Sequence, residues 1–144
     1  GMMIILNPSP YNEKLDSCDF KKISMLLLNE VEGAQVTGEK DEKKILVRLK
    51  ELYPDMQVVL TLGKDGSVYQ YKDQVYRQGI FSVQAVDTTA AGDTFTGYFI
   101  SSILEGMPVD EGLKLAAKAS AIAVSREGAT ASIPVKAEVE SVDW

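Results

Sequence analysis

The stretch DTTAAGDTFTGYF, residues 87–99, decides the fold, because it places two acidic side chains, Asp87 and Asp93, around a turn of small residues. A strand-like run precedes the turn and contains Phe81, Val83, Ala85 and Val86. The turn itself holds three small residues that allow a sharp change of direction: Ala90, Ala91 and Gly92. Apolar side chains then recur at helical spacing, at Phe95, Phe99 and Ile103. The pattern predicts a strand, a tight turn and a helix that starts beside Asp93.

The start of this predicted helix is suited to binding an anion. The first backbone N–H groups of a helix have no intrahelical partner and point outward. Asp93 would lie at the mouth of that site, where a carboxylate can take a proton from a hydroxyl while the N–H groups hold a phosphoryl group. A simpler interpretation is that Asp93 only caps the helix, as Asp often does. The residues alone leave both interpretations open.

Composition and charge restrict the class of protein. The 144 residues are 45% hydrophobic with interspersed charges, which indicates one globular domain with a core. A net charge of −6 argues against nucleic acid or an anionic membrane as a partner. We find no signal peptide and no apolar run long enough to span a bilayer. The absence of histidine excludes a Ser-His-Asp triad, and a single cysteine, Cys18, suits a reducing cytoplasm.

Strand-like and helix-like segments alternate along the chain, which predicts an α/β fold with a mostly parallel sheet and helices on its faces. The expected strands cover residues 3–6, 25–28 and 57–62, and a β-hairpin covers residues 67–71 and 74–78. The expected helices cover residues 16–23, 39–53, 91–104 and 109–125.

The string at residues 87–99 resembles the signature of the ribokinase-like carbohydrate kinases. Four more segments resemble motifs of that family in the same order: IILNPSP at 4–10, NEVEGAQVTG at 29–38, TLGKDG at 61–66 and REGATASIP at 126–134. The resemblance implies a three-layer ribokinase-like fold in which residues 1–144 form a single domain, the C-terminal nucleotide-binding half. The family's N-terminal half, with its Gly-Gly sugar-binding motif and β lid, has no counterpart here.

The resemblance implies that the catalytic site lies at the start of the 91–104 helix. Asp93 would be the general base that accepts a proton from a sugar hydroxyl. The N–H groups of Ala90, Ala91, Gly92 and Asp93 would stabilise the oxygens of the transferring phosphoryl group. The helix dipole keeps Asp93 ionised and therefore a weak base. A weak base suffices, because a loose phosphoryl-transfer transition state needs little early deprotonation.

The nucleotide site is expected at the ends of the predicted strands, where open α/β sheets bind ligands. By resemblance, Asn29 and Glu32 help to hold the triphosphate of ATP, with Glu32 acting through Mg²⁺ and ordered water. Their spacing also fits a capping box, and the two roles are compatible. The resemblance places Thr61 and Gly63 near the phosphates, in a nucleotide turn that includes Gly66. The turn lacks the Walker pattern of phosphate-binding loops. Its residues alone also fit an ordinary glycine turn at the end of a strand.

Two further sites follow from the resemblance. Ala117 would border the adenine pocket, although the small side chains of its helix also fit close helix–sheet packing. A K⁺ site would use the side chains of Asp87, Thr89 and Ser132 and the carbonyls of Ala123, Arg126 and Gly128. A cation there would hold the turn in place and strengthen the positive electrostatic field at the anion site. The alternative is that Asp87 is satisfied by neighbouring backbone N–H groups.

The function implied by the resemblance is ATP-dependent phosphoryl transfer to a hydroxyl of a sugar, with this chain carrying the nucleotide-binding and catalytic-base half. The alternative is a catalytically inactive fragment that binds nucleotide or a partner chain. Because the covering half is missing, a sheet edge and an apolar face would be exposed, and we expect a homo-oligomer or a separate N-terminal half as partner.

Overall fold

The computed structural model describes residues 3–7, 22–81, 83, 91–125 and 139–140. It divides into two compact units. The first unit holds residues 1–63 and 67–77, and the second holds residues 64–66 and 78–144. Within the described residues, no helix has the length and apolar character needed to cross a membrane.

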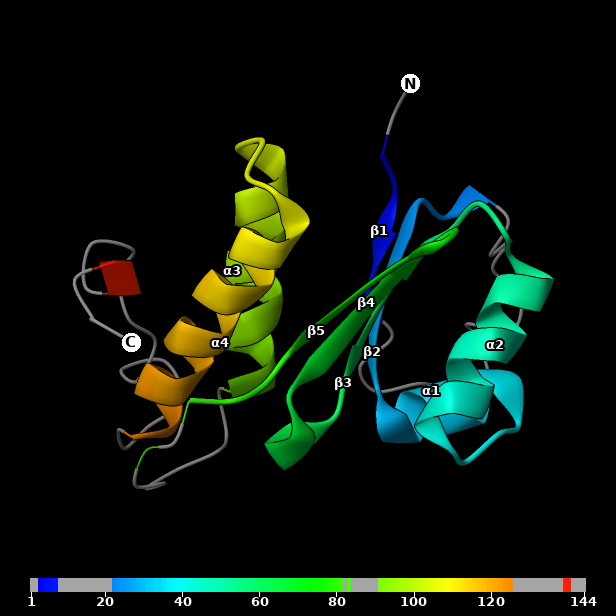
Figure 1. The fold of residues 1–144 in the computed structure, drawn as a ribbon, viewed down its shortest axis with the longest axis horizontal. Helices are drawn as coiled ribbons and strands as arrows, with labels where there is room; N and C mark the ends of the chain where they lie inside the picture. The colour runs from blue at the N-terminus through cyan, green and yellow to red at the C-terminus, as the bar shows by residue number, and fades with distance from the viewer. Residues whose placement is uncertain (1–2, 8–21, 82, 84–90, 126–138, 141–144) are drawn as a thin grey trace. The chain divides into compact units, whose positions relative to one another are not determined.

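The first unit is built on a five-stranded sheet (Figure 1). Its strands lie in the order in which they follow along the chain: β1 (Ile5–Leu6), β2 (Met25–Asn29), β3 (Gln57–Thr61), β4 (Ser67–Tyr71) and β5 (Gln74–Gln78). The first three strands are parallel, and β4 runs antiparallel to β3. The mostly parallel α/β sheet and the hairpin expected from the sequence are therefore confirmed.

Two helices, α1 (Glu30–Thr37) and α2 (Glu42–Leu52), cover one face of this sheet (Figure 1). Alternate strand residues point into the core between sheet and helices, because side chains alternate across a strand. The core includes strand residues Leu26, Leu28, Val58, Leu60 and Val68 and helix residues Ile45, Leu46 and Leu49. Strand residues of the opposite face are also buried: Met25, Leu27, Val59 and Tyr69. Burial on both faces explains why the central strands are continuously apolar.

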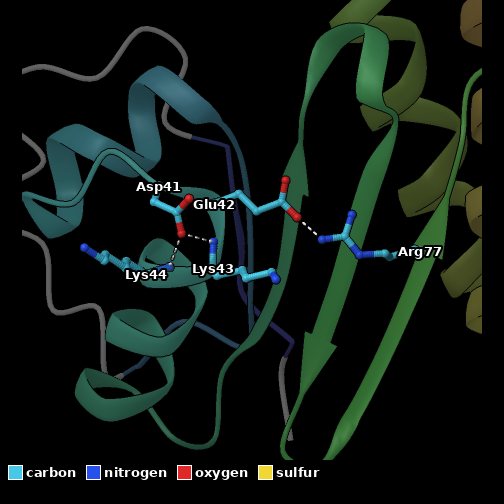
Figure 2. Close-up of polar contacts among 5 residues, drawn as sticks. All are labelled: Asp41, Glu42, Lys43, Lys44 and Arg77. Carbon is cyan, nitrogen blue, oxygen red and sulfur yellow. Dashed lines mark hydrogen bonds and ion pairs between the residues drawn. The ribbon is translucent and has the colours of Figure 1, made fainter.

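Helix α2 begins later than the residues 39–53 expected from periodicity, because Asp41 caps it (Figure 2). The Asp41 carboxylate accepts hydrogen bonds from the backbone N–H groups of Lys43 (3.1 Å) and Lys44 (3.2 Å). The next residue, Glu42, forms an ion pair with Arg77 of β5 (Figure 2). The first turn of α2 is thus tied to the edge strand of the hairpin.

The second unit contains two packed helices, α3 (Ala91–Leu104) and α4 (Val109–Val124). Their bounds agree closely with the expected helices at 91–104 and 109–125. The helices pack closely at Gly112, where an added Cβ would lie 3.3 Å from the Cβ of Ser102. The rings of Phe95 and Phe99 stack on α3 with centroids 6.4 Å apart.

Parts of the expected layout lie outside the described residues. These are most of the expected helix at 16–23, residues 84–90 at the end of the strand-like run and the start of the turn, and the loop at 126–134. Phe81 and Val83, the described members of that strand-like run, are not in a strand. Helix α1 was expected only through the capping interpretation of Asn29 and Glu32.

Candidate functional site

Three polar residues form a row across the end of the sheet of the first unit. Asn29 ends β2 and is the direct partner of Thr61, which ends β3. On the other side of Thr61, the direct partner on β4 is Ser67. Because β2 and β3 are parallel, Asn29 and Thr61 lie at their carboxyl ends, the edge at which open α/β sheets bind ligands. The structure thus makes direct neighbours of Asn29 and Thr61, two residues that the sequence analysis expected in a nucleotide site, and places Ser67 beside Thr61.

Asn29 and Glu32 form a complete capping box at the start of α1. The Asn29 Oδ1 accepts from the Glu32 backbone N–H (2.8 Å), and the Glu32 Oε2 accepts from the Asn29 backbone N–H (3.0 Å). The capping interpretation is therefore confirmed, and the nucleotide role, which is compatible with it, stays a prediction. Glu32 is 5% exposed although it carries a carboxyl group.

The capping box leaves polar atoms available for a ligand. Among the described residues, no hydrogen-bond partner is found for Glu32 Oε1 or for the Asn29 side-chain NH₂ group. A carboxylate oxygen beside amide and hydroxyl groups is a donor set that fits Mg²⁺, which binds through one or two carboxylates, water and phosphate oxygens. In the described part of the chain, no three acidic or cysteine side chains converge on an all-protein metal site. The set therefore fits a magnesium ion that arrives with phosphate.

The expected nucleotide turn connects β3 to β4 and contains a short 3₁₀ helix, η3 (Gly63–Asp65). The Thr61 hydroxyl donates to the Leu28 carbonyl over 3.4 Å, which is a long hydrogen bond. Gly63 has a φ of 56° and open space around it. Gly66 has a φ of 90°, and a Cβ on it would overlap the backbone carbonyl of Gln78. Gly66 is thus required by the packing of the turn, independently of any ligand.

In the second unit, α3 begins at Ala91, so Asp93 lies in the first turn of the helix and is exposed. This position differs from the N-cap position that the simpler interpretation gave it. The Ser120 hydroxyl of α4 donates to the Ala91 carbonyl (3.2 Å) and fixes the helix start. Gly92 is exposed beside Asp93, whereas Ala90 lies outside the described residues.

The remaining predicted site residues are divided between α4 and undescribed segments. Ala117 (8% exposed) and Ala123 (1%) are buried on α4. The other members of the expected K⁺ site lie outside the described residues: Asp87, Thr89, Arg126, Gly128 and Ser132. That site stays a prediction.

Two buried hydroxyl groups beside the predicted residues were missed by the sequence analysis. Ser67 and Thr94 are each 2% exposed, and within the described part of the chain their hydroxyl oxygens have no hydrogen-bond partner. Ser67 pairs with Thr61, and Thr94 follows Asp93. The available signal for Ser67 was the turn at residues 61–66, because the register of β4 against β3 across this turn decides which residue faces Thr61.

Known proteins share the sequence pattern and the fold of this chain. The model of the pfkB family of carbohydrate kinases matches residues 1–136. The ribokinase of Haemophilus influenzae is 35% identical over 142 residues, which cover 96% of this chain and 46% of that protein. The chain thus spans about half the length of the curated relatives it matches.

Solved structures show the same relation. The Arabidopsis thaliana ribokinase complexed with ribose and ATP has a TM-score of 0.82 and 30% identity, over 96% of this chain and 46% of that chain. The Cryptococcus neoformans ribokinase in complex with ADP has a TM-score of 0.85 and 28% identity, over 96% of this chain and 51% of that chain. A family model that matches nearly the whole chain and a shared fold lead to one conclusion: the chain belongs to the pfkB family of carbohydrate kinases.

Proposed function

We propose that this chain is the nucleotide-binding and catalytic-base half of an ATP-dependent sugar kinase. The observation that carries the proposal is the pairing of Asn29 with Thr61 at the carboxyl ends of parallel strands, with Glu32 held beside Asn29. Family membership supports it, and so does the likeness to ribokinases solved with ATP and with ADP. Residues 1–144, including both compact units, would act as one domain of the complete enzyme.

Nucleotide and magnesium would bind at the strand ends. Asn29 would donate its free NH₂ group to a phosphate oxygen, and Glu32 would hold water of the magnesium shell. Thr61 and Gly63 would contact the phosphates from the adjacent turn, and Ala117 would border the adenine. When bound, magnesium supplies charge neutralisation on the phosphate oxygens.

Asp93 would act as the general base on the sugar hydroxyl. Asp93 lies in the first turn of α3, where its carboxylate can face a bound hydroxyl beside the N–H groups of the helix start. The N–H groups at the start of α3 would stabilise the transferring phosphoryl group, at about 3 kcal/mol for each donor. A K⁺ ion held by the 87–89 and 126–132 segments would strengthen this field.

A second function is that these 144 residues, which span 46% of the Haemophilus influenzae relative, bind nucleotide or a partner chain by themselves. Catalysis of phosphoryl transfer depends on positioning and water exclusion, to which the other half of a relative contributes. A chain without that half could bind nucleotide or a partner chain and catalyse nothing. In either case we expect a cytoplasmic setting, in keeping with the single cysteine.

The experiment restores the other half, by fusion or co-expression with the N-terminal segment of a ribokinase, and measures phosphorylation of ribose. The chain alone should show negligible activity, and the restored enzyme should be active. Asp93→Asn removes the base at constant size, so kcat should fall by a factor on the order of 10² to 10⁴ while nucleotide affinity changes little.

The matched control is Asp110→Asn, which changes another exposed acidic residue in the first turn of a helix, α4. This variant should keep its kcat. A restored Asp93→Asn enzyme with a near-normal kcat would show that Asp93 is not the base. A restored enzyme that binds nucleotide and phosphorylates nothing would support the binding-only function.

A further inference from the structure

Ser67 carries a buried hydroxyl group at the start of β4. It is 2% exposed, and its Oγ has no hydrogen-bond partner among the residues that the structure describes. Folded proteins pair nearly all buried polar groups, so each exception calls for an explanation such as a functional role. Ser67 opens β4 and is the direct partner of Thr61.

Thr61 is the natural partner for this hydroxyl. Directly opposed residues of an antiparallel pair share one face of the sheet, and Thr–Ser hydrogen bonds are a regular form of cross-strand contact. The Thr61 hydroxyl donates to the Leu28 carbonyl over 3.4 Å, near the outer limit for a hydrogen bond. Thr61 can therefore give up this bond at small cost.

The position of the pair on the sheet points toward a ligand. One row earlier on the same face, the paired residues are apolar and buried: Leu27, Val59 and Tyr69. The face becomes polar at the last row, which runs from exposed Asn29 through half-buried Thr61 to buried Ser67. Ser67 is too enclosed to meet a ligand itself, whereas Thr61 lies between it and the exposed end of the row.

We propose that Ser67 positions Thr61 for binding the phosphate end of a magnesium-bound nucleotide. Ser67 donates its hydroxyl proton to Thr61 Oγ1, and Thr61 turns its own proton from the Leu28 carbonyl to a phosphate oxygen. Each hydroxyl then donates once, and the Ser67 proton gains the acceptor that it lacks. The exchange is favourable because a hydrogen bond to a charged phosphate oxygen is stronger than one to a neutral carbonyl. This inference rests on the proposed function.

The test is a double-mutant cycle on the 144-residue chain, with Ser67→Ala, Thr61→Val and the double variant, titrated calorimetrically with ADP and Mg²⁺. Ser67→Ala should weaken MgADP binding by roughly tenfold, equivalent to about 1.4 kcal/mol. In the Thr61→Val background, the same change should have almost no effect, because the hydroxyl through which Ser67 acts is gone. Adenosine binding, which involves no phosphate, should be unchanged by Ser67→Ala.

Stability provides an independent readout. Ser67→Ala should leave the unfolding free energy unchanged or raise it, because it removes a buried hydroxyl that makes no hydrogen bond within the described residues. The matched control is Ser102→Ala, since Ser102 is 1% exposed and its hydroxyl donates to the Tyr98 carbonyl over 2.7 Å. That variant should lose stability and keep its MgADP affinity. Ser67→Cys, which keeps a weaker donor at similar size, should give an intermediate affinity.

The outcomes separate the inference from the proposed function. If the wild-type chain binds MgADP and Ser67→Ala and Ser67→Cys bind it equally well, the inference is wrong and the proposed function stands. An equal loss in the wild-type and Thr61→Val backgrounds would also overturn the inference. If the wild-type chain binds no MgADP at all, the proposed function fails and the inference fails with it.

Discussion

Gly63 and Gly66 lie on one turn, and the structure gives them different reasons to be glycine. Both have positive φ, 56° and 90°, which strains any side chain. A Cβ on Gly63 meets no atom of the described residues within 4 Å, whereas a Cβ on Gly66 would overlap the Gln78 carbonyl. The φ value alone therefore explains Gly63, and Gly66 also allows two backbone segments to approach closely.

This difference predicts two sizes of effect on stability. Gly63→Ala should lower the unfolding free energy by about 1–2 kcal/mol, the strain of a left-handed residue. Gly66→Ala should lower it by a further 1–3 kcal/mol or more, because backbone must move to admit the methyl group. Urea denaturation of both variants measures the difference. Equal losses would mean that the close approach to Gln78 does not exist in solution.

Tyr69 predicts a loss of stability at alkaline pH. Burial, together with Tyr71 and Tyr76, raises the pKa of Tyr69 from 10.0 to about 12. The neutral phenol is therefore favoured in the folded state, and its contribution is complete below pH 10 and lost as the pH rises toward 12. The loss should reach about 2–3 kcal/mol, and urea denaturation between pH 8 and 12 measures it.

Tyr69→Phe is the control for this prediction. It removes the titrating group and the hydrogen bond that the Tyr69 hydroxyl donates to Gln57 Oε1 over 2.6 Å. The variant should be about 1 kcal/mol less stable near neutral pH, but it should lose less stability between pH 10 and 12. Identical alkaline losses in both proteins would contradict the assignment to Tyr69.

At the scale of elements, the two helices of the second unit predict opposite responses to the same substitution. Gly97 is exposed on α3 with nothing near its missing Cβ, so Gly97→Ala should stabilise the protein by about 1 kcal/mol through helix propensity. Gly112→Ala gains the same propensity, but its methyl group would lie 3.3 Å from Ser102 Cβ at the helix crossing. Thermal unfolding should show a higher Tm for Gly97→Ala and no gain or a loss for Gly112→Ala. A matching gain in both would mean that the helices do not pack closely at Gly112.

Helix α1 shows where a layout based on apolar periodicity is incomplete. The burial of its first turn is the reverse of what side-chain polarity predicts, since the apolar Val31 is 67% exposed and its charged neighbour Glu32 is 5% exposed. Its ends are set instead by polar and backbone features: the Asn29–Glu32 capping box and Gly38, which has a φ of 77° and donates its N–H to the Ala34 carbonyl. Helix α3, by contrast, follows from the spacing of Phe95, Phe99 and Ile103. Apolar periodicity predicts helices that pack through a stripe of apolar side chains, and α1 lacks such a stripe.

At the scale of the molecule, the sequence predicted the parallel strands and which residues lie at their ends. It predicted less well which residues of neighbouring strands contact one another. Asn29 and Thr61 were placed near the phosphates by separate motifs, and strand register makes them direct partners. The unpaired hydroxyl of Ser67 could not be predicted, because it depends on the register across a turn. Long-range pairing is a property of the folded chain, and local patterns do not carry it.

The edges of the described sheet predict association. β1 and β5 are its outer strands, and apolar side chains on or beside them are exposed, with Ile4 at 42% and Val75 at 56%. An exposed strand edge offers unpaired backbone groups to another chain. We expect a homodimer or larger assembly by light scattering over a concentration series. A charge at the edge that pairs should weaken the assembly, so Ile4→Lys tests the β1 edge and Val75→Lys tests the β5 edge. Val47→Lys, at an exposed residue of α2, is the control and should leave the assembly unchanged. A monomer at every concentration would contradict the prediction.

The most direct test of the central claim is a calorimetric titration of the 144-residue chain with ADP in the presence and absence of Mg²⁺. If the strand ends form a nucleotide site, ADP binds weakly at millimolar concentration, and Mg²⁺ increases its affinity. Glu32→Gln keeps the capping box but removes the charge, so it should abolish most of the magnesium effect while ADP alone still binds. Absence of heat and of a thermal shift at millimolar nucleotide would contradict the claim that this chain carries the nucleotide-binding half of a sugar kinase.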